Sequence, residues 1–145
     1  MKKLLCLMLL CLSAFTCWAQ NAPKSYIERY KDLAVEQMHA HGIPASIVLA
    51  VAIHESGSGT SKIARLQFNH FGMKGRTYYK EYQSSYRSYD SVAASYADFS
   101  QMLKTRKQFR VLFHYDRYDY RAWVLGMQKG RYAASKRWAS QVIAI

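Results

Sequence analysis

The sequence predicts a mostly α-helical domain of the α+β class, in which one small β-hairpin lobe lies between helices. Residues 45–53 (ASIVLAVAI) are apolar on every side apart from one serine, which is typical of a helix at the buried centre of its domain. Capping residues and helical spacing of apolar side chains mark several further helices. Between Arg76 and Tyr89 the pattern changes to a short alternation of aromatic and polar residues, which predicts the hairpin.

The N-terminal segment has the features of a secretory signal peptide. A basic start is followed by an apolar run over residues 4–18, and Ala19 is a small residue suited to the cleavage site. The run is shorter than the roughly 20 residues of a membrane-spanning helix. We therefore expect a signal peptide over residues 1–19, one domain over residues 20–145, export to the periplasm or the cell exterior, and no membrane insertion after cleavage. A buried N-terminal helix is the alternative.

The cysteines and histidines exclude several classes of site. Cys6, Cys11 and Cys17 all lie in the signal-like segment, so the mature domain has no disulfide, no thiol nucleophile and no cysteine metal site. Acylation of Cys17 would instead make the protein a lipoprotein. The histidines lack the spacing of metal ligands, and no nucleotide-binding motif is present. We therefore expect neither a metal nor a cofactor.

The charge of the chain indicates its partner. The formal net charge is +12, and it falls to +10 when Lys2 and Lys3 leave with the signal peptide. Such a charge favours a polyanionic partner, unless it only keeps the surface soluble. Export argues against nucleic acid, and it leaves cell-wall glycans with their peptide carboxylates, or anionic lipids, as the polyanions outside the cytoplasmic membrane.

The first half of the domain is expected to hold three helices. A capping box that starts at Ser25 opens a helix over residues 26–41. Pro44 suits the first turn of the central apolar helix, which ends at Ser56 before a glycine-rich turn. A threonine or a serine just before residues 62–67 then caps a short helix.

The second half is expected to hold three more helices. Asp90 caps a helix that ends near Thr105. Asp119 opens the next helix, and Gly130 ends it. A last helix begins at about Ser135 and continues to the C-terminus. We find no repeat and no second domain, and we expect a monomer.

Glu55 is the residue best placed for chemistry. Val48, Val51 and Ala52 precede it by seven, four and three residues, so its side chain projects from a face that is otherwise buried. Burial penalises the charged carboxylate, and the negative end of the helix dipole acts in the same direction, so both raise its pKa. A carboxyl that keeps its proton near neutral pH suits a general acid for a glycosidic oxygen. An ordinary solvated glutamate is the alternative.

Residues 52–75 (AIHESGSGTSKIARLQFNHFGMKG) resemble the bacterial glucosaminidase domain of glycoside hydrolase family 73, which includes autolysins and wall-cutting domains of flagellar assembly proteins. The matching residues are Glu55, Ser56, Gly57, Gly59, Ser61, Asn69, Phe71, Gly72 and Lys74. Weaker matches extend over nearly the whole mature chain. The resemblance implies a lysozyme-like helical fold with a cleft beside the β lobe. It also implies hydrolysis of the β-1,4 bond after N-acetylglucosamine in peptidoglycan glycan strands.

The resemblance also assigns roles to single residues. Glu55 aligns with the catalytic acid of the family. Glu81, the acid in the expected β lobe, is the candidate second carboxylate, although the 2-acetamido group of the substrate could act in its place. The other candidates from the resemblance are Tyr132 near the cleaved sugar and Asn69 and Phe71 on the cleft floor. Tyr78 is a candidate for stacking on a sugar because aromatic residues are frequent in the expected hairpin, and packing within the hairpin is the alternative.

Purely structural roles could also explain these residues, and other functions are compatible with the sequence. Tyr132 could be a core aromatic, Glu81 a solvated residue, and Asn69 a partner for loop backbone groups. A lytic transglycosylase on the same fold also needs one glutamate, and it differs by leaving an anhydro sugar end. A cationic wall-binding module without activity and a basic membrane-active protein are the remaining alternatives.

Overall fold

The computed structural model describes the backbone of residues 2–75 and 84–145, and the side chains from residue 22 onward within those ranges. The described part is mostly helical, which confirms the predicted helical character of the domain. Its elements are α1 (Lys2–His41), α2 (Ala45–Ser56), α3 (Lys62–Gln67), α4 (Val92–Thr105), the 3-10 helix η1 (Lys107–His114), α5 (Tyr120–Lys129) and α6 (Trp138–Ile143). None of the described helices combines the length and the apolar character that a membrane crossing requires.

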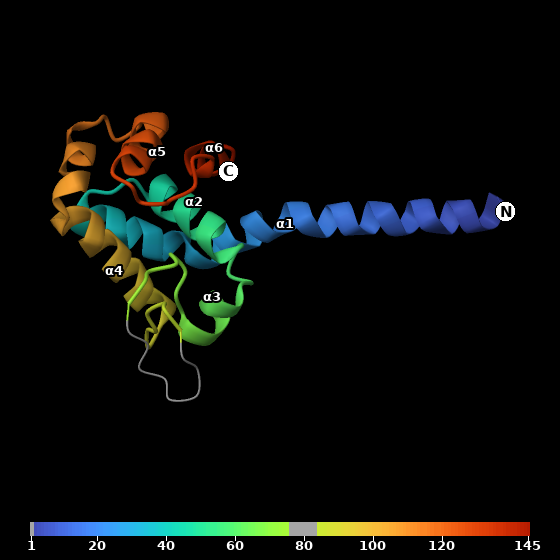
Figure 1. Cartoon of the computed structure of the whole chain (residues 1–145). Coiled ribbons are helices and arrows are strands. Elements are labelled where there is room, and N and C mark those ends of the chain that lie inside the picture. The colour runs from blue at the N-terminus through green and yellow to red at the C-terminus, as the bar shows by residue number, and fades with distance from the viewer. Residues whose placement is uncertain (1, 76–83) are drawn as a thin grey trace.

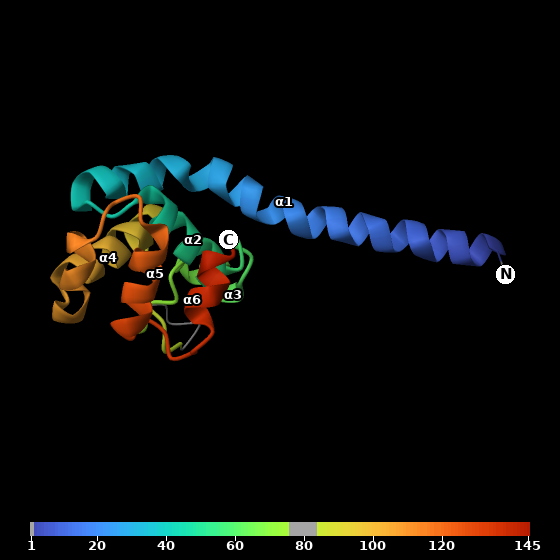
Figure 2. The ribbon, with the colours of Figure 1, turned by 90° about the horizontal axis from the view of Figure 1, so that it is seen from above.

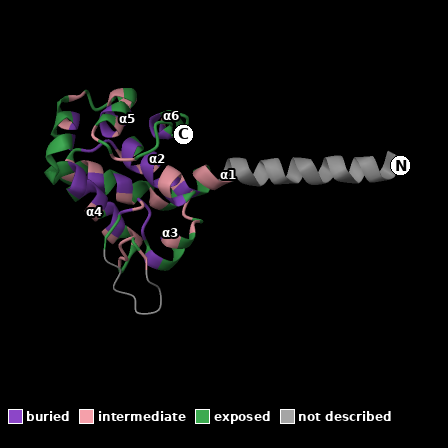
Figure 3. Ribbon diagram, viewed as in Figure 1, coloured by how far each residue is buried: buried purple, intermediate pink, exposed green. Residues whose placement is uncertain are grey.

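Helix α2 lies at the centre of the domain. It packs against the C-terminal part of α1 on one side and against α5 and α6 on the other (Figures 1 and 2). Its buried residues are Ile47, Val48, Ala50, Val51, Ala52, Ile53 and Ser56 (Figure 3). The sequence predicted this burial from the apolar run. Pro44 precedes the first turn, and Gly57 ends the helix in the left-handed region, with φ 57°.

The predicted start of the first helix at Ser25 is wrong. Helix α1 runs without a break from Lys2 to His41, and Pro23 lies inside it. A capping box needs backbone N–H groups that have no partner within the helix. The residues before Ser25 are already helical, so their carbonyl groups accept hydrogen bonds from the N–H groups that a capping box would otherwise satisfy. Ser25 is therefore an ordinary helical residue.

The β-hairpin lobe is not supported. Residues 76–83 lie outside the described residues, and the described residues around them form one isolated antiparallel bridge, Lys74 to Tyr86, and no strand. The side chain of Asp98 in α4 holds the returning segment instead. It accepts hydrogen bonds from the Arg87 guanidinium at 2.6 Å and from the Tyr89 hydroxyl at 2.5 Å. This tertiary anchoring positions the segment as an irregular loop.

The remaining helix ends mostly follow the predictions. Ser61 caps α3, and Asp119 caps α5 by accepting from the Ala122 amide at 2.9 Å. Helix α4 is capped by Ser91 and not by Asp90, because the Ser91 hydroxyl is the acceptor that reaches the amide three residues on.

The last helix begins at Trp138, later than predicted. The chain first turns at Arg131, which adopts the left-handed region with φ 59°. The Tyr132 amide donates to the Met127 carbonyl at 3.0 Å within this turn. The turn directs Tyr132 back toward the end of α2.

Candidate active site

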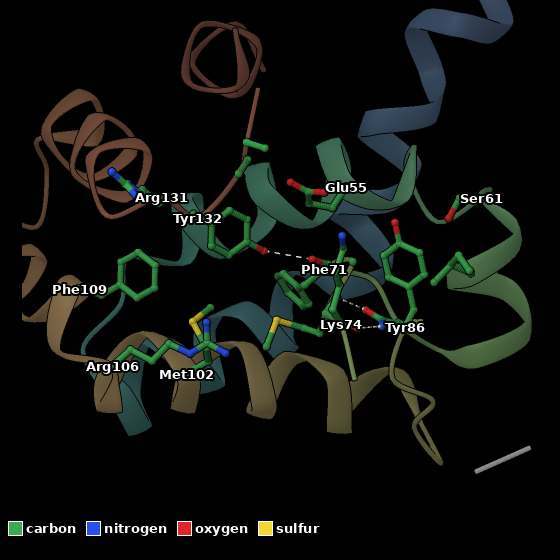
Figure 4. A pocket seen from close by; sticks show the side chains of 16 residues that line it. Glu55, Ser61, Phe71, Lys74, Tyr86, Met102, Arg106, Phe109, Arg131 and Tyr132 are labelled. Carbon is green, nitrogen blue, oxygen red and sulfur yellow. Dashed lines mark hydrogen bonds between the residues drawn. The ribbon is translucent and has the colours of Figure 1, made fainter. Parts of the chain in front are cut away.

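A cavity of about 520 Å³ lies where the end of α2 meets the loops around it. This volume is in the range of ligand sites. Figure 4 shows the cavity from close by, with Ser61 at one end, Phe109, Arg106 and Arg131 at the other, and Glu55 between them. The lining residues are Glu55, Ser61, Ile63, Asn69, Phe71, Gly72, Met73, Lys74, Tyr86, Met102, Arg106, Phe109, Arg131, Tyr132, Ala133 and Ala134.

The carboxyl group of Glu55 is held by an indole. The Trp138 Nε1–H donates to Glu55 Oε1 at 2.7 Å, across 83 residues of sequence. Trp138 is 2% exposed, so the indole side of this hydrogen bond is buried, whereas the carboxyl group itself is only partly buried and lines the cavity. Burial raises the pKa of Glu55 above its ordinary value, and the indole hydrogen bond and the neighbouring His54 only partly oppose this. The direction agrees with the sequence prediction.

A glycine faces the other oxygen of the carboxyl group. Gly72 has φ 61°, and a Cβ atom placed on it would lie 3.3 Å from Glu55 Oε2. The loop backbone can therefore approach Oε2 closely without covering it with a side chain. Glycine at this position serves both the left-handed backbone and the close approach.

Tyr132 lies beside Glu55 in the same cavity. Its hydroxyl donates to the Phe71 carbonyl at 3.1 Å, which ties the loop around Gly72 to the C-terminal part of the chain (Figure 4). Its pKa is raised, first by burial and then by the charge of Glu55. The structure thus brings together Glu55 and Tyr132, which the sequence analysis named separately.

Asn69 and Phe71 both line the cavity, and both also hold the fold. Asn69 is 1% exposed; its Nδ2 donates to the carbonyls of Met73 and Arg87 at 2.9 Å each, and its Oδ1 accepts from the Met73 amide at 3.0 Å. Phe71 stacks on Phe99 with ring centroids 4.2 Å apart. The polar atoms of Asn69 are therefore engaged by loop backbone, as the alternative explanation required.

The two other sequence candidates, Glu81 and Tyr78, lie outside the described residues. Among the acidic residues that the structure describes, Glu55 alone lines the cavity. The nearby Asp98 is engaged by Arg87 and Tyr89. The described part of the chain therefore supplies one carboxyl group to this site.

Lys74, Arg106 and Arg131 give the cavity a basic character, and none of them makes an ion pair with a described residue. Lys74 belongs to the motif that the sequence analysis matched, whereas Arg106 and Arg131 were missed. Trp138, which contacts Glu55, was missed as well. No sequence signal marks these three, since a basic side chain in a basic protein and an aromatic residue in an apolar helix are both ordinary.

A helical fold with a protonatable carboxyl group in a cavity is the arrangement that a glycoside hydrolase requires, since these enzymes use carboxylic acids to cleave bonds between sugars. The comparison with protein families agrees. The glucosaminidase model, described as mannosyl-glycoprotein endo-β-N-acetylglucosaminidase, matches residues 31–145. The chain belongs to this family. No curated protein sequence matches the chain significantly.

Solved structures share the fold. The catalytic domain of the autolysin Auto from Listeria monocytogenes has 21% identity and a TM-score of 0.70, over 85% of this chain and 81% of that chain. A peptidoglycan hydrolase from Sphingomonas sp. A1 has 20% identity and a TM-score of 0.68, over 81% and 83%. The glycoside hydrolase domain of FlgJ from Salmonella typhimurium has 20% identity and a TM-score of 0.68, over 84% of both chains.

Proposed function

We propose that this protein hydrolyses the β-1,4 bond that follows N-acetylglucosamine in peptidoglycan, with Glu55 as the general acid. The observation that carries the proposal is the state of Glu55, a partly buried carboxyl group with a raised pKa at the middle of the cavity. Such a group stays protonated near neutral pH and can donate its proton to the glycosidic oxygen of the leaving sugar. Tyr132 lines the subsite of the cleaved sugar, next to this acid.

Two observations support the substrate class: the positive charge of the cavity and of the domain, and the solved structures that share the fold. Three basic residues, Lys74, Arg106 and Arg131, line the cavity, and the domain after residue 19 carries a net charge of +10. Peptidoglycan strands carry carboxylates on their peptides, so these cations favour them over neutral glycans. The autolysin, the peptidoglycan hydrolase and the FlgJ domain named above share the fold, which agrees with this substrate.

The second half of the reaction needs a group that stabilises the sugar cation. Glu81 is our candidate carboxylate, and the 2-acetamido group of the substrate is the alternative. A Glu81→Gln variant distinguishes the two. A loss of turnover similar to that of Glu55→Gln supports a second carboxylate, and near-normal turnover supports the acetamido group.

We also propose that residues 1–19 are a signal peptide and that the domain over residues 20–145 acts as a monomer outside the cytoplasmic membrane. The basic start and the apolar run support export. The substrate lies in the same compartment.

The test of the proposed function is digestion of purified peptidoglycan, with the fragment masses read afterwards. Fragments that end in reducing N-acetylglucosamine are expected. Anhydro ends would assign the chain to the lytic transglycosylases, and no release of fragments would assign it to the wall-binding modules. Glu55→Gln should lower turnover by about two to four orders of magnitude. A Glu55→Gln protein that folds and keeps full activity would contradict the acid assignment.

A further inference from the structure

We propose that Trp138 and Gly72 divide the two oxygens of Glu55 between them, so that Oε1 is held by the indole and Oε2 carries the catalytic proton. The inference rests on the proposed function of Glu55. It assigns to Trp138 the role of a positioning residue, and it assigns to Gly72 the role of keeping the acid oxygen accessible.

The chemistry of the indole decides which oxygen carries the proton. An indole N–H is a donor only, so the oxygen that it contacts must act as an acceptor. Glu55 Oε1 is that oxygen, at 2.7 Å from Trp138 Nε1. A proton on Oε1 would have to avoid this donor, whereas no N–H group of the described residues donates to Oε2. The neutral acid is therefore arranged with its proton on Oε2.

The surroundings of the indole hold it in place. Trp138 is buried, and its ring packs at 5.1 Å from the Tyr132 ring and at 6.4 Å from the His54 ring. The amide of the next residue, Ala139, donates to Gln128 Oε1 in α5 at 3.1 Å. The donor is thus fixed before substrate arrives, and it fixes the plane of the Glu55 carboxyl group in turn.

Gly72 leaves the other oxygen open. Any side chain there would begin 3.3 Å from Oε2, in the space that a glycosidic oxygen needs to come within hydrogen-bond distance. The ring of Tyr86 is the next neighbour, 4.0 Å from the same Cβ position. The glycine therefore sets the direction from which the acid can be reached.

The proton transfer follows from this division. The proton passes from Oε2 to the bridging oxygen while the bond between that oxygen and the sugar C1 breaks, and the bond's electron pair stays with the leaving oxygen. Glu55 becomes a carboxylate, and the Trp138 hydrogen bond strengthens as this charge develops. A contact that is stronger in the transition state than before it accelerates the step. Water then supplies hydroxide to C1 and returns a proton to Glu55.

Loss of the indole donor should raise the pKa of Glu55, because the hydrogen bond stabilises the charged form. A hydrogen bond to a charged group corresponds to about one to two pKa units. In Trp138→Phe, kcat should fall about tenfold or more, and the alkaline limb of its pH profile should move upward by about one unit. A Glu55 pKa measured by carbon NMR of the labelled carboxyl group should move in the same direction.

The control is Trp123→Phe. Trp123 is also a buried tryptophan, and its Nε1 donates to the Asp116 carbonyl at 3.2 Å, away from the cavity. Its loss should lower the melting temperature and leave the pH profile unchanged. If Trp138→Phe does not fold, replacement of Trp138 by benzothienylalanine keeps the ring shape and removes only the N–H donor.

A second pair of variants tests the open oxygen. Gly72→Ala and Gly57→Ala both place a Cβ on a residue with positive φ, at 61° and 57°, so their backbone strain is matched. Only Gly72→Ala adds an atom next to Oε2, and it alone should lower kcat by about tenfold or more.

The outcomes separate this inference from the proposed function. If wild-type protein cleaves peptidoglycan while Trp138→Phe and the benzothienylalanine protein keep the wild-type pH profile and Glu55 pKa, Trp138 is only a core residue and the inference is wrong. Equal losses in Gly72→Ala and Gly57→Ala would likewise overturn the role of Gly72. If wild-type protein releases no fragments, the proposed function fails, whereas the NMR titration still tests the indole contact.

Discussion

The amide of Asn69 holds the loop that brings Gly72 to Glu55, and its removal should cost the domain a large part of its stability. The side chain makes three hydrogen bonds to loop backbone and is 1% exposed. In Asn69→Ala these bonds are lost, and the amide of Met73 and the carbonyls of Met73 and Arg87 lose a partner.

The magnitude follows from this count of bonds. Each hydrogen bond contributes about 1 kcal/mol net, and a buried group left without a partner costs about 1–3 kcal/mol. We expect the free energy of unfolding to fall by about 3–4 kcal/mol. For a domain of this size the melting temperature should fall by about 10 °C.

The assay is urea unfolding followed by circular dichroism, with KM measured on the same samples. Asn69→Asp is the matched variant, because it keeps the acceptor for the Met73 amide and loses both Nδ2 donors. Its loss of stability should be at least as large as that of Asn69→Ala, because the new carboxylate oxygen is buried and faces the two carbonyl oxygens that Nδ2 served. A change below about 1 kcal/mol for Asn69→Ala, together with a raised KM, would refute this reasoning and make Asn69 a substrate contact.

Three further predictions concern charge, pH and export. Arg106→Gln combined with Arg131→Gln should raise KM several-fold on peptidoglycan at low salt and leave a neutral chitin oligomer unaffected; equal effects on both substrates would indicate a structural role. Burial lowers the pKa of His70 from 6.5 to about 4, so the unfolded chain binds more protons between those values and stability should fall as pH drops from about 6.5 to 4. His70→Gln should flatten this part of the curve of unfolding free energy against pH, and an unchanged slope would contradict the assignment. N-terminal sequencing of protein from the producing cell should begin near Gln20, and a chain that still starts at Met1 would disprove export.

Local patterns were sufficient for most of the helices and for one site residue. The apolar run of α2, the capping residues Ser61 and Asp119 and the glycine after α2 act through neighbours within a few residues, so they can be read along the chain. The partial burial of Glu55 could also be predicted locally, because Glu55 lies on the buried face of the apolar helix α2.

Contacts between distant segments could not be read in this way. Local rules marked Ser25 as a helix start and predicted a hairpin that returns through residues 84–89. The helix before Ser25 and the anchoring of Arg87 by Asp98 gave a different structure in the described part of the chain. The partner of Glu55 lies 83 residues away, and the Tyr132 hydroxyl meets the Phe71 carbonyl across 61 residues. Such pairs form only when α2, α6 and the loops pack around one core, since no periodicity or spacing along the chain encodes which side chains then face each other. The chain alone therefore predicted Glu55 as the acid, and the packing of α6 against α2 decided which of its two oxygens the Trp138 indole contacts.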